Sequence, residues 1–430
     1  MLAMSLSSPL PILSVHPSRA LVDEKFEVIV ENLSPGCPVT IRSLHHSEDG
    51  DDWEAYGLYV SDHTGRVSVS QDMSFGGTYS GRESMGLIWS MRPVPGSRTG
   101  LRLRKKDITT PMLVSISLYS GHEDFRDKSP LASMVTERWY MGPGMQRIKI
   151  TEGGLRGSLF IPPGPGPYPG MLDLWGAGGG LVEYRSALLA SHGYVCLALE
   201  YFKMGHMKST DMSFDYFVKA YHVLKGHPQV IPDKVGIIGM CLGTVVTLNL
   251  VAENTEIKPS CVVCISNVIS KSPGNSLSGF QQSIPSEFNK IRLDENNYQI
   301  WKDVGLAVLK EPSMKVNVAK INCPLLLVNG CDDQNWCAVE TADDISNTMN
   351  AAGKGHLVTR LDYADTGHLI EPPFLPHCAA GNVILHSSNE KVIQAYGGKT
   401  KPHSHAQEDS WTKILSFLQH HLYCRPTAKL

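Results

Sequence analysis

The chain has 430 residues, of which 42% are hydrophobic and 19% are charged, a balance that is typical of globular proteins and excludes a largely disordered chain. Its 39 basic and 42 acidic residues give a formal net charge of −3, so its charge offers no basis for nucleic-acid binding. We find no apolar segment suited to span a membrane, and the N-terminus lacks the cationic region of a secretory signal. A chain of this length predicts two or three domains.

Residues 1–140 are predicted to form an N-terminal all-β sandwich domain. Strand-like runs at 25–31, 39–44 and 112–119 alternate in polarity and are separated by turns rich in Gly, Pro, Asp and Asn. Helical periodicity is absent from this region. Because it offers no obvious catalytic set, we expect it to serve as a scaffold or a lid.

From residue 141 to 424 the pattern changes to alternating strands and helices. Strands are predicted at 147–150, 157–161, 170–175, 194–199, 234–238, 261–265, 324–328 and 357–361, and helices at 184–192, 214–225 and 244–252. This alternation indicates an α/β fold with a mostly parallel sheet covered on both faces. An insertion at about 267–322 contains one amphipathic helix, Tyr298–Leu309, and a last helix is expected over Ser410–Leu422.

A nucleophile elbow is predicted at Cys241, which lies at the centre of Gly239-Met240-Cys241-Leu242-Gly243. An apolar strand precedes this pentapeptide and a helix follows it, so the two glycines would let the chain turn sharply and present the central side chain. The usual elbow residue is Ser, so a Cys here bears on the reaction as well as on the fold. The alternative is that Cys241 is a small buried hydrophobic residue.

A Cys nucleophile needs a base and an acid that orients the base. In hydrolases of the α/β type these follow the nucleophile in the order acid, then base, at the ends of later strands. Asp333 and His368 occupy such positions, with Asp332 as the alternative acid. For His368 the alternative is an ordinary surface histidine, since the chain has 17.

An oxyanion hole would combine the backbone N–H of Leu242 with another from the glycine-rich loop after an earlier strand. That loop is Trp175-Gly176-Ala177-Gly178-Gly179-Gly180, and we expect the second donor among Gly176, Ala177 and Gly178. A phosphate-binding P-loop is excluded because the Lys-Ser/Thr pair of that motif is missing. The sequence leaves open which amide donates.

The cysteines and the C-terminus bear on cellular location. Ten scattered cysteines suit reduced thiols better than a disulfide framework, and Cys261-x-x-Cys264 is interpreted as part of a strand. Residues 425–430 form a tail that ends in Ala428-Lys429-Leu430, a close variant of the Ser-Lys-Leu peroxisomal signal. The tail therefore predicts the peroxisomal import receptor as a partner, and a location in the peroxisome or the cytosol.

With these residues in place, the chain resembles the bile acid-CoA:amino acid N-acyltransferase and acyl-CoA thioesterase family along nearly its whole length. The motifs that carry the resemblance are Trp89-Ser-Met, Arg138-Trp-Tyr-Met, Trp175-Gly-Ala-Gly-Gly-Gly-Leu-Val-Glu-Tyr-Arg, the elbow, Gly330-x-Asp-Asp, Gly367-His-Leu-Ile-Glu-Pro-Pro and His405-Ala-Gln-Glu-Asp-Ser-Trp. The resemblance implies a β-sandwich followed by an α/β-hydrolase domain that acts on acyl-CoA thioesters, with Cys241, Asp333 and His368 matching the family triad. In this family thioesterases carry Ser at the elbow and amino-acid N-acyltransferases carry Cys.

The function that we expect is therefore transfer of a bile-acid or fatty acyl group from CoA to glycine or taurine through an acyl-Cys241 intermediate. The alternative is a thioesterase that hydrolyses acyl-CoA, and a third class is a non-catalytic acyl-CoA or lipid carrier. Departures from the transferase pattern at Met240, 242–244 and 384–392 leave the acyl group and the acceptor open. CoA is a substrate here, and no metal or redox cofactor is expected.

Two further expectations concern binding and assembly. Lys203, Lys271 and Lys310 lie where CoA phosphates could reach, but each is interpreted as a solvated charge, so the CoA-binding residues stay open. The chain shows no long apolar edge and no heptad seam, which favours a monomer.

Overall fold

A computed structural model describes residues 10–201, 213–272, 277, 285–385 and 390–424. The chain divides into two compact units. The β unit comprises 1–99, 103–140 and 373–377, and the α/β unit comprises 100–102, 141–372 and 378–430. Among the residues so described, none of the helices is long and apolar enough to cross a membrane.

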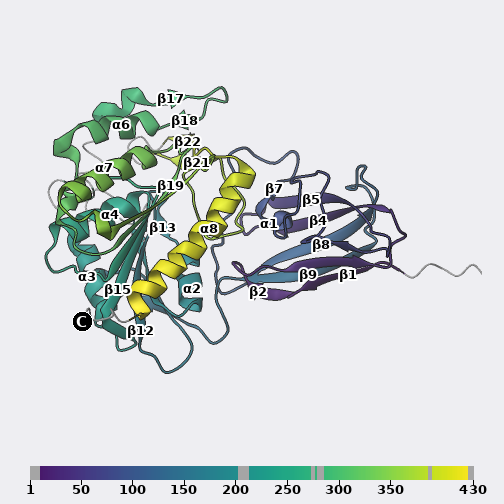
Figure 1. Ribbon diagram of the computed structural model, residues 1–430, viewed down its shortest axis with the longest axis horizontal. Helices are drawn as coiled ribbons and strands as arrows, with labels where there is room; N and C mark the ends of the chain where they lie inside the picture. The colour runs from purple at the N-terminus through teal and green to yellow at the C-terminus, as the bar shows by residue number, and fades with distance from the viewer. Residues whose placement is uncertain (1–9, 202–212, 273–276, 278–284, 386–389, 425–430) are drawn as a thin grey trace, which may run out of the picture. The chain divides into compact units, whose positions relative to one another are not determined.

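The β unit is a sandwich of two sheets (Figure 1). The larger sheet has the order β2-β9-β8-β4-β5-β7, with bounds Arg19–Leu21, Ala132–Trp139, Met112–Ser120, Pro38–His46, Asp52–Val60 and Arg92–Pro93. The smaller sheet has the order β1-β3-β6, with bounds Ile12–His16, Glu27–Glu31 and Val67–Ser68. Alternate residues of β8, such as Val114, Ile116 and Leu118, are fully buried, as the alternation in polarity predicted. One short helix, α1 (Gly86–Trp89), was not expected from the sequence.

The α/β unit is built on a mostly parallel sheet. Its main path has the order β10-β11-β14-β12-β15-β16-β19-β20, with bounds Gln146–Ile150, Gly157–Ile161, Val195–Tyr201, Tyr168–Leu174, Val230–Met240, Cys261–Ile265, Leu325–Gly330 and Val358–Tyr363. The strands from β14 to β20 on this path are parallel, whereas β10 and β11 form an antiparallel edge, and β13 (Gly180–Leu181) pairs antiparallel with the end of β14. The fold is that of an α/β hydrolase, as predicted.

Helices cover both faces of this sheet. Figure 1 shows α3 (Phe214–Lys225), α4 (Leu242–Glu253) and α7 (Ala338–Ala351) on one side and α8 (Thr400–Leu418) on the other. The helix α2 (Tyr184–Ser191) ends beside α8, because the rings of His192 and Trp411 lie 6.4 Å apart. Nearly every residue of α4 is buried, which agrees with its largely apolar sequence.

The last helix begins earlier than predicted. We expected Ser410–Leu422, but α8 starts at Thr400, ends at Leu418 and continues into a single π-helical turn, Gln419–Tyr423. Pro402 lies in the first turn of α8, where proline is tolerated because the N–H groups there have no intrahelical partner. The proline therefore marks a helix start, which we had placed ten residues too late.

The insertion between β16 and β19 forms part of a small second sheet. Its described elements are η4 (Pro285–Lys290), β17 (Arg292–Leu293), β18 (Gln299–Ile300), α6 (Lys302–Lys310), η5 (Pro312–Met314) and η6 (Val318–Lys320). The predicted helix start at Tyr298 is wrong, because Gln299 and Ile300 pair as a strand with β17 and β22. This sheet, β17-β18-β22-β21, also uses two strands that were not predicted, β21 (Ala380–Ile384) and β22 (Lys391–Ala395). Short turns η1 (Glu152–Gly154) and η7 (Gly355–Leu357) complete the described helical elements.

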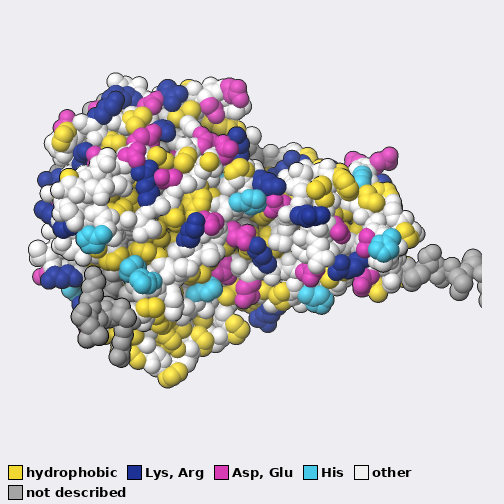
Figure 2. Space-filling model, in the orientation of Figure 1, with side chains coloured by type: hydrophobic (Ala, Val, Ile, Leu, Met, Phe, Trp, Pro, Cys, Tyr) yellow, Lys and Arg dark blue, Asp and Glu magenta, His cyan; other side chains and the backbone are white. Residues whose placement is uncertain are grey.

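Charged side chains of both signs are interspersed on the face shown in Figure 2, and no continuous field of one sign covers it. This distribution agrees with the near balance of basic and acidic residues in the sequence.

Candidate active site

Cys241 lies on a sharp turn between β15 and α4. Its backbone has φ 53° and ψ −120°, a conformation that non-glycine residues rarely adopt, and its N–H donates to the carbonyl of Ile265 over 3.0 Å. A Cβ on Gly239 would lie 2.5 Å from the Gly243 oxygen, and one on Gly243 would lie 2.4 Å from the Leu174 oxygen. Both glycines are therefore required by close backbone packing, and the pentapeptide forms the predicted elbow.

The thiol of Cys241 is placed differently from those of the cysteines in the strands. Cys241 is half-buried, whereas Cys196, Cys261 and Cys264 are buried. Burial raises the pKa of each of those three thiols well above its usual value. The Cys261-x-x-Cys264 motif is thus part of strand β16, as interpreted, and the exposure of Cys241 does not fit the alternative of a simple core residue.

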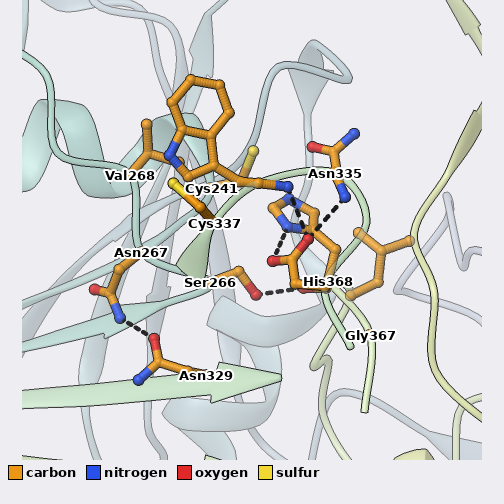
Figure 3. A network of polar contacts seen from close by, with 12 residues as sticks. Cys241, Ser266, Asn267, Val268, Asn329, Asn335, Cys337, Gly367 and His368 are labelled. Carbon is orange, nitrogen blue, oxygen red and sulfur yellow. Dashed lines mark hydrogen bonds and ion pairs between the residues drawn. The ribbon is translucent and has the colours of Figure 1, made fainter. Parts of the chain in front are cut away.

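His368, labelled in Figure 3, forms a buried pair with Asp333. His368 Nδ1 lies 2.7 Å from Asp333 Oδ2, and each residue is only 1% exposed. The other carboxylate oxygen, Oδ1, accepts from the backbone N–H groups of Asn335 and Trp336, both over 2.8 Å. An ionised carboxylate only accepts hydrogen bonds, so Nδ1 carries the proton in this pair and Nε2 is left for another partner.

The electrostatics of His368 link it to both of the other predicted residues. Burial by itself lowers the pKa of His368, but the neighbouring Asp333 carboxylate and the Cys241 side chain raise it to about 10. Nε2 makes no well-aligned hydrogen bond within the described part of the chain, yet Cys241 is close enough to change the pKa. Figure 3 shows Cys241 beside His368, in agreement with this electrostatic effect, so the structure brings Cys241, His368 and Asp333 together.

The alternative acid, Asp332, has a different environment. Its Oδ2 accepts from the backbone N–H of Gly398 over 2.8 Å, and its Oδ1 accepts from the side-chain amide of Gln334 over 2.6 Å. Both oxygens of Asp332 thus hold loops in place, whereas Asp333 contacts the imidazole. The geometry favours Asp333 as the orienting acid.

Two of the predicted oxyanion donors, Leu242 and Gly176, are neighbours of Cys241. Leu242 is the first residue of α4, so its N–H has no partner within the helix. A Cβ on Gly176 would lie 3.2 Å from Cys241 Cβ and 3.7 Å from Sγ, which places this glycine against the thiol. Ala177 and Gly178 follow in an exposed turn. Among the three loop residues, Gly176 is the one that this contact places beside Cys241.

A buried ion pair that was not predicted holds the glycine loop. Asp173 and Arg185 are 0% and 1% exposed, and Asp173 also accepts from Ser186 Oγ over 2.6 Å. The Arg185 guanidinium donates to the Leu174 carbonyl over 3.1 Å and lies over the Trp175 ring, 4.2 Å from its centroid. These contacts fix the residues that immediately precede Gly176.

The loop that carries His368 is held by contacts with three residues that were not predicted from the sequence. Ser266 Oγ donates to the His368 carbonyl, and the His368 N–H donates to the Tyr396 carbonyl over 2.8 Å. The ring of His403 accepts from the Gly367 N–H over 3.1 Å and contacts the Leu369 carbonyl over 2.8 Å. Ser266 follows strand β16 directly, so its place at a strand end was a usable signal, whereas the contact of His403 was not visible in the sequence.

Two of the sequence expectations fall outside the described residues, namely Lys203 and the terminal tripeptide Ala428-Lys429-Leu430. Lys271 and Lys310 are both exposed. Within the described ranges, His, Cys, Asp and Glu side chains form no group of three or more suited to hold a metal ion.

Two family profiles match the chain. Residues 23–152 match "Acyl-CoA thioester hydrolase/BAAT N-terminal region", and residues 212–424 match "BAAT / Acyl-CoA thioester hydrolase C terminal".

Curated relatives are similar along almost the whole chain. Acyl-coenzyme A thioesterase 1 of Rattus norvegicus is 34% identical over 95% of this chain and 96% of its own length. The peroxisomal succinyl-coenzyme A thioesterase of Mus musculus is 36% identical over 95% and 96%. The mitochondrial acyl-coenzyme A thioesterase 2 of Mus musculus is 35% identical over 95% and 89%.

Among solved structures, a thermophilic esterase from Thermogutta terrifontis is similar, with 13% identity, a TM-score of 0.41, and coverage of 67% of this chain and 96% of that one.

Proposed function

The chain belongs to the acyl-CoA thioester hydrolase and bile acid-CoA:amino acid N-acyltransferase family, and from this premise we propose that it is an acyl-CoA:amino acid N-acyltransferase. The proposed donor is a bile-acid or fatty acyl-CoA, and the proposed acceptor is glycine or taurine. The observation that carries this proposal is the cysteine at the elbow, next to a buried His–Asp pair. The coarser conclusion, an enzyme that acts on acyl-CoA thioesters, is supported by the family and by the names of the relatives.

In the first half of the proposed reaction, the Cys241 thiolate attacks the thioester carbonyl of acyl-CoA. The N–H groups of Leu242 and of the loop at Gly176 would stabilise the oxyanion that forms, since both flank the thiol. The intermediate then collapses and the C–S bond to CoA breaks. His368 gives its Nε2 proton to the departing CoA sulfur, and Cys241 retains the acyl group as a thioester.

In the second half, the now neutral His368 takes a proton from the amino group of the acceptor. The nitrogen attacks the acyl-Cys241 carbonyl, the C–S bond breaks, and the products are an amide and the Cys241 thiolate beside the His368 imidazolium. Asp333 holds the ring throughout and favours its charged form. No step needs a metal or redox cofactor.

The sulfur at position 241 favours an amine over water as the acceptor. A thioester reacts with amines far more readily, relative to water, than an oxoester does. Exchange of the CoA thioester for an enzyme thioester also changes the free energy little, so the acyl group stays activated for attack by the acceptor. An acyl-cysteine intermediate therefore suits amide formation, whereas an acyl-serine suits hydrolysis.

Hydrolysis of acyl-CoA to free acid and CoA is the second candidate function. It is favoured by the curated relatives, each of which is named a thioesterase. The same residues serve both reactions, since water can replace the amine in the second half. A non-catalytic carrier is disfavoured, because the thiol, the base and the acid are all retained.

Product analysis separates these candidates. Purified protein would be given choloyl-CoA or palmitoyl-CoA, with and without glycine or taurine, and the acyl products would be identified by mass spectrometry. We expect amidated product from the wild type and none from Cys241→Ala. Free acid as the sole product, at a rate that the amines do not change, would contradict transfer and establish a thioesterase.

We further propose that Ala428-Lys429-Leu430 directs the protein to peroxisomes through the import receptor. The small-basic-Leu ending supports this, and one relative is named a peroxisomal enzyme. A full-length fusion with an N-terminal fluorescent protein is expected to colocalise with a peroxisomal marker. The same fusion without its last three residues should be cytosolic, and unchanged peroxisomal fluorescence would contradict the proposal.

A further inference from the structure

A basic cavity lies in the α/β unit, and nothing in the proposed reaction steps uses it. Its volume is about 720 Å³, and its walls include Arg147, Lys149, Arg156, Ser158 and Glu200. Every residue that lines it comes from the α/β unit. The cavity thus combines three cationic side chains with a single carboxylate.

Strand pairing explains why these side chains meet. Lys149 of β10 lies directly opposite Ser158 of β11, and Arg147 is two residues from Lys149, so the three side chains share one face of the sheet. Glu200 is two residues beyond Ala198, which pairs with Ser158, and therefore lies on the same face. The cluster is a consequence of the β10-β11-β14 register.

The polar groups of the cavity are incompletely satisfied. Ser158 is fully buried, yet its Oγ has no hydrogen-bond partner among the residues that the structure describes. A buried hydroxyl without a partner is costly, which indicates that a ligand or water completes it. Lys149 and Arg156 are exposed, and within the described residues neither has a recorded ion pair. Arg147 is instead anchored by Glu183, with contacts of 2.7 and 3.0 Å.

The cavity lies at the same edge of the sheet as Cys241. Glu200 is near the carboxyl end of β14 and pairs with Leu181, a cavity residue that follows the glycine loop by one position. Cys241 follows the carboxyl end of β15, which is separated from β14 only by β12. Two strand spacings amount to about 10 Å, and the four spacings that separate Lys149 of β10 from β15 amount to about 19 Å. A ligand held in the cavity could therefore extend a flexible arm along residues 176–180 to the thiol.

From these observations we propose that this cavity binds the phosphates of the 3′-phospho-ADP part of CoA. Lys149 and Arg156 would pair with phosphate oxygens, Arg147 would add positive charge, and Ser158 would donate from the floor. Glu200 would accept from a ribose hydroxyl or the adenine amino group. The pantetheine arm would then pass over the glycine loop to Cys241. This inference rests on the proposed action on acyl-CoA, and it places the CoA phosphates away from Lys271 and Lys310.

Direct binding tests the cavity without requiring turnover. Adenosine 3′,5′-bisphosphate would be titrated into the full chain by calorimetry, and into the variants Lys149→Ala, Arg156→Ala and the double variant. We expect each single change to raise Kd about tenfold and the double change at least 50-fold, with weaker binding at higher salt. Lys258→Ala is the matched control, because Lys258 is exposed and precedes β16 at the opposite edge of the sheet.

Kinetics would connect the cavity to the substrate. We would compare kcat/KM for acyl-CoA with kcat/KM for the corresponding acyl-N-acetylcysteamine thioester, which lacks the phosphates. The ratio of the first value to the second should fall at least tenfold in the double variant. An unchanged ratio together with an unchanged Kd would overturn the proposal. The wild type could bind adenosine 3′,5′-bisphosphate through Lys149 and Arg156 and yet turn over no acyl-CoA. That result would contradict the proposed function but support the proposed phosphate site.

Discussion

Two buried carboxylates near the carboxyl edge of the same sheet each face a cation, and the two pairs differ in the kind of cation. Asp173 contacts Arg185 with an oxygen–nitrogen distance of 3.0 Å to Nε, and Asp333 contacts His368 over 2.7 Å. All four residues are at most 1% exposed. A guanidinium keeps its proton in proteins, whereas an imidazolium can release one. The first pair therefore fixes structure, and the second can also move a proton.

The two ion pairs also differ in the groups that their cations contact. Beyond Arg185 lie the Leu174 carbonyl and the Trp175 ring, which lead into Gly176. Beyond His368 lies Cys241, whose thiol is the nucleophile of the proposed reaction. The two pairs thus have similar burial and similar charge but different roles. The Asp173–Arg185 pair positions the glycine loop, and the Asp333–His368 pair activates the thiol. Changes to each pair should accordingly affect different measurements.

The largest effect is expected from Asp333→Asn. An amide in place of the carboxylate cannot stabilise the imidazolium, and its NH2 group can force the wrong His368 tautomer. We expect kcat for acyl-CoA to fall about 10³- to 10⁴-fold, as in comparable triads. Asp332→Asn is the matched control, since Asp332 only holds backbone and Gln334, and its loss should stay within about tenfold. Equal losses in the two variants would remove the distinction between the neighbouring aspartates.

The second effect is on stability and should come from Arg185→Met. This change leaves Asp173 as a buried charge without its cation, which costs about 3–5 kcal/mol of unfolding free energy in comparable cases. Urea denaturation would measure the loss. Lys413→Met is the control, because the Lys413–Asp409 pair on α8 is about half exposed and should contribute less than about 1 kcal/mol. A loss no larger than that of the control would show that the Asp173–Arg185 pair is dispensable for folding.

The third effect concerns the pH range of the titratable pair. Because Asp333 and Cys241 raise the pKa of His368 to about 10 against the effect of burial, the imidazolium should persist through neutral pH and titrate near pH 10. The value of kcat/KM for acyl-CoA, which reports groups of the free enzyme, should then fall only as the pH approaches 10. In Asp333→Asn the attraction of the carboxylate is lost while burial still disfavours the charged ring, so the pKa of His368 should fall below that of the wild type. Nitrogen-15 NMR of the His368 ring would report both values, and identical titrations in the two proteins would contradict this account.

Much of the site could be predicted because its signals are local. The elbow is five consecutive residues, and the acid and base each follow an apolar strand, so short-range pattern sufficed to identify Cys241, Asp333 and His368. The helix α3, Phe214–Lys225, lies where the sequence predicted a helix. Its apolar periodicity is clear, and Ser213 caps its first turn by accepting from the Asp215 N–H.

The parts that were missed depend on contacts between distant segments. Gln299 and Ile300 pair with the nearby β17, and Gln299 also pairs with Gln394 of β22, almost a hundred residues later. Ser266 reaches the His368 carbonyl across 102 residues of sequence. The pairing of Asp173 with Arg185 joins a strand to a helix, and no spacing rule connects them. Such contacts are set by packing, which local propensity does not report.

The smallest effect is expected from His403, which positions the base without contacting the reacting atoms. Its Nδ1 accepts from the Gly367 N–H, so its other nitrogen carries the proton and donates to the Leu369 carbonyl, and the ring thereby bridges the peptides on both sides of His368. Removal of both contacts in His403→Phe should lower kcat about tenfold, which corresponds to about 1.4 kcal/mol.

His403→Gln is the informative partner variant, because its amide offers one acceptor and one donor and should recover part of the activity. A purely structural role would lower thermal stability and leave the His368 titration unchanged. A positioning role should shift that titration and slow alkylation of Cys241 by iodoacetamide, since a displaced imidazolium no longer stabilises the thiolate. If Cys241 of His403→Phe were alkylated at the wild-type rate and kcat were unchanged, His403 would have no part in positioning His368. The contacts of Ser266 and Tyr396 would then suffice to hold the loop.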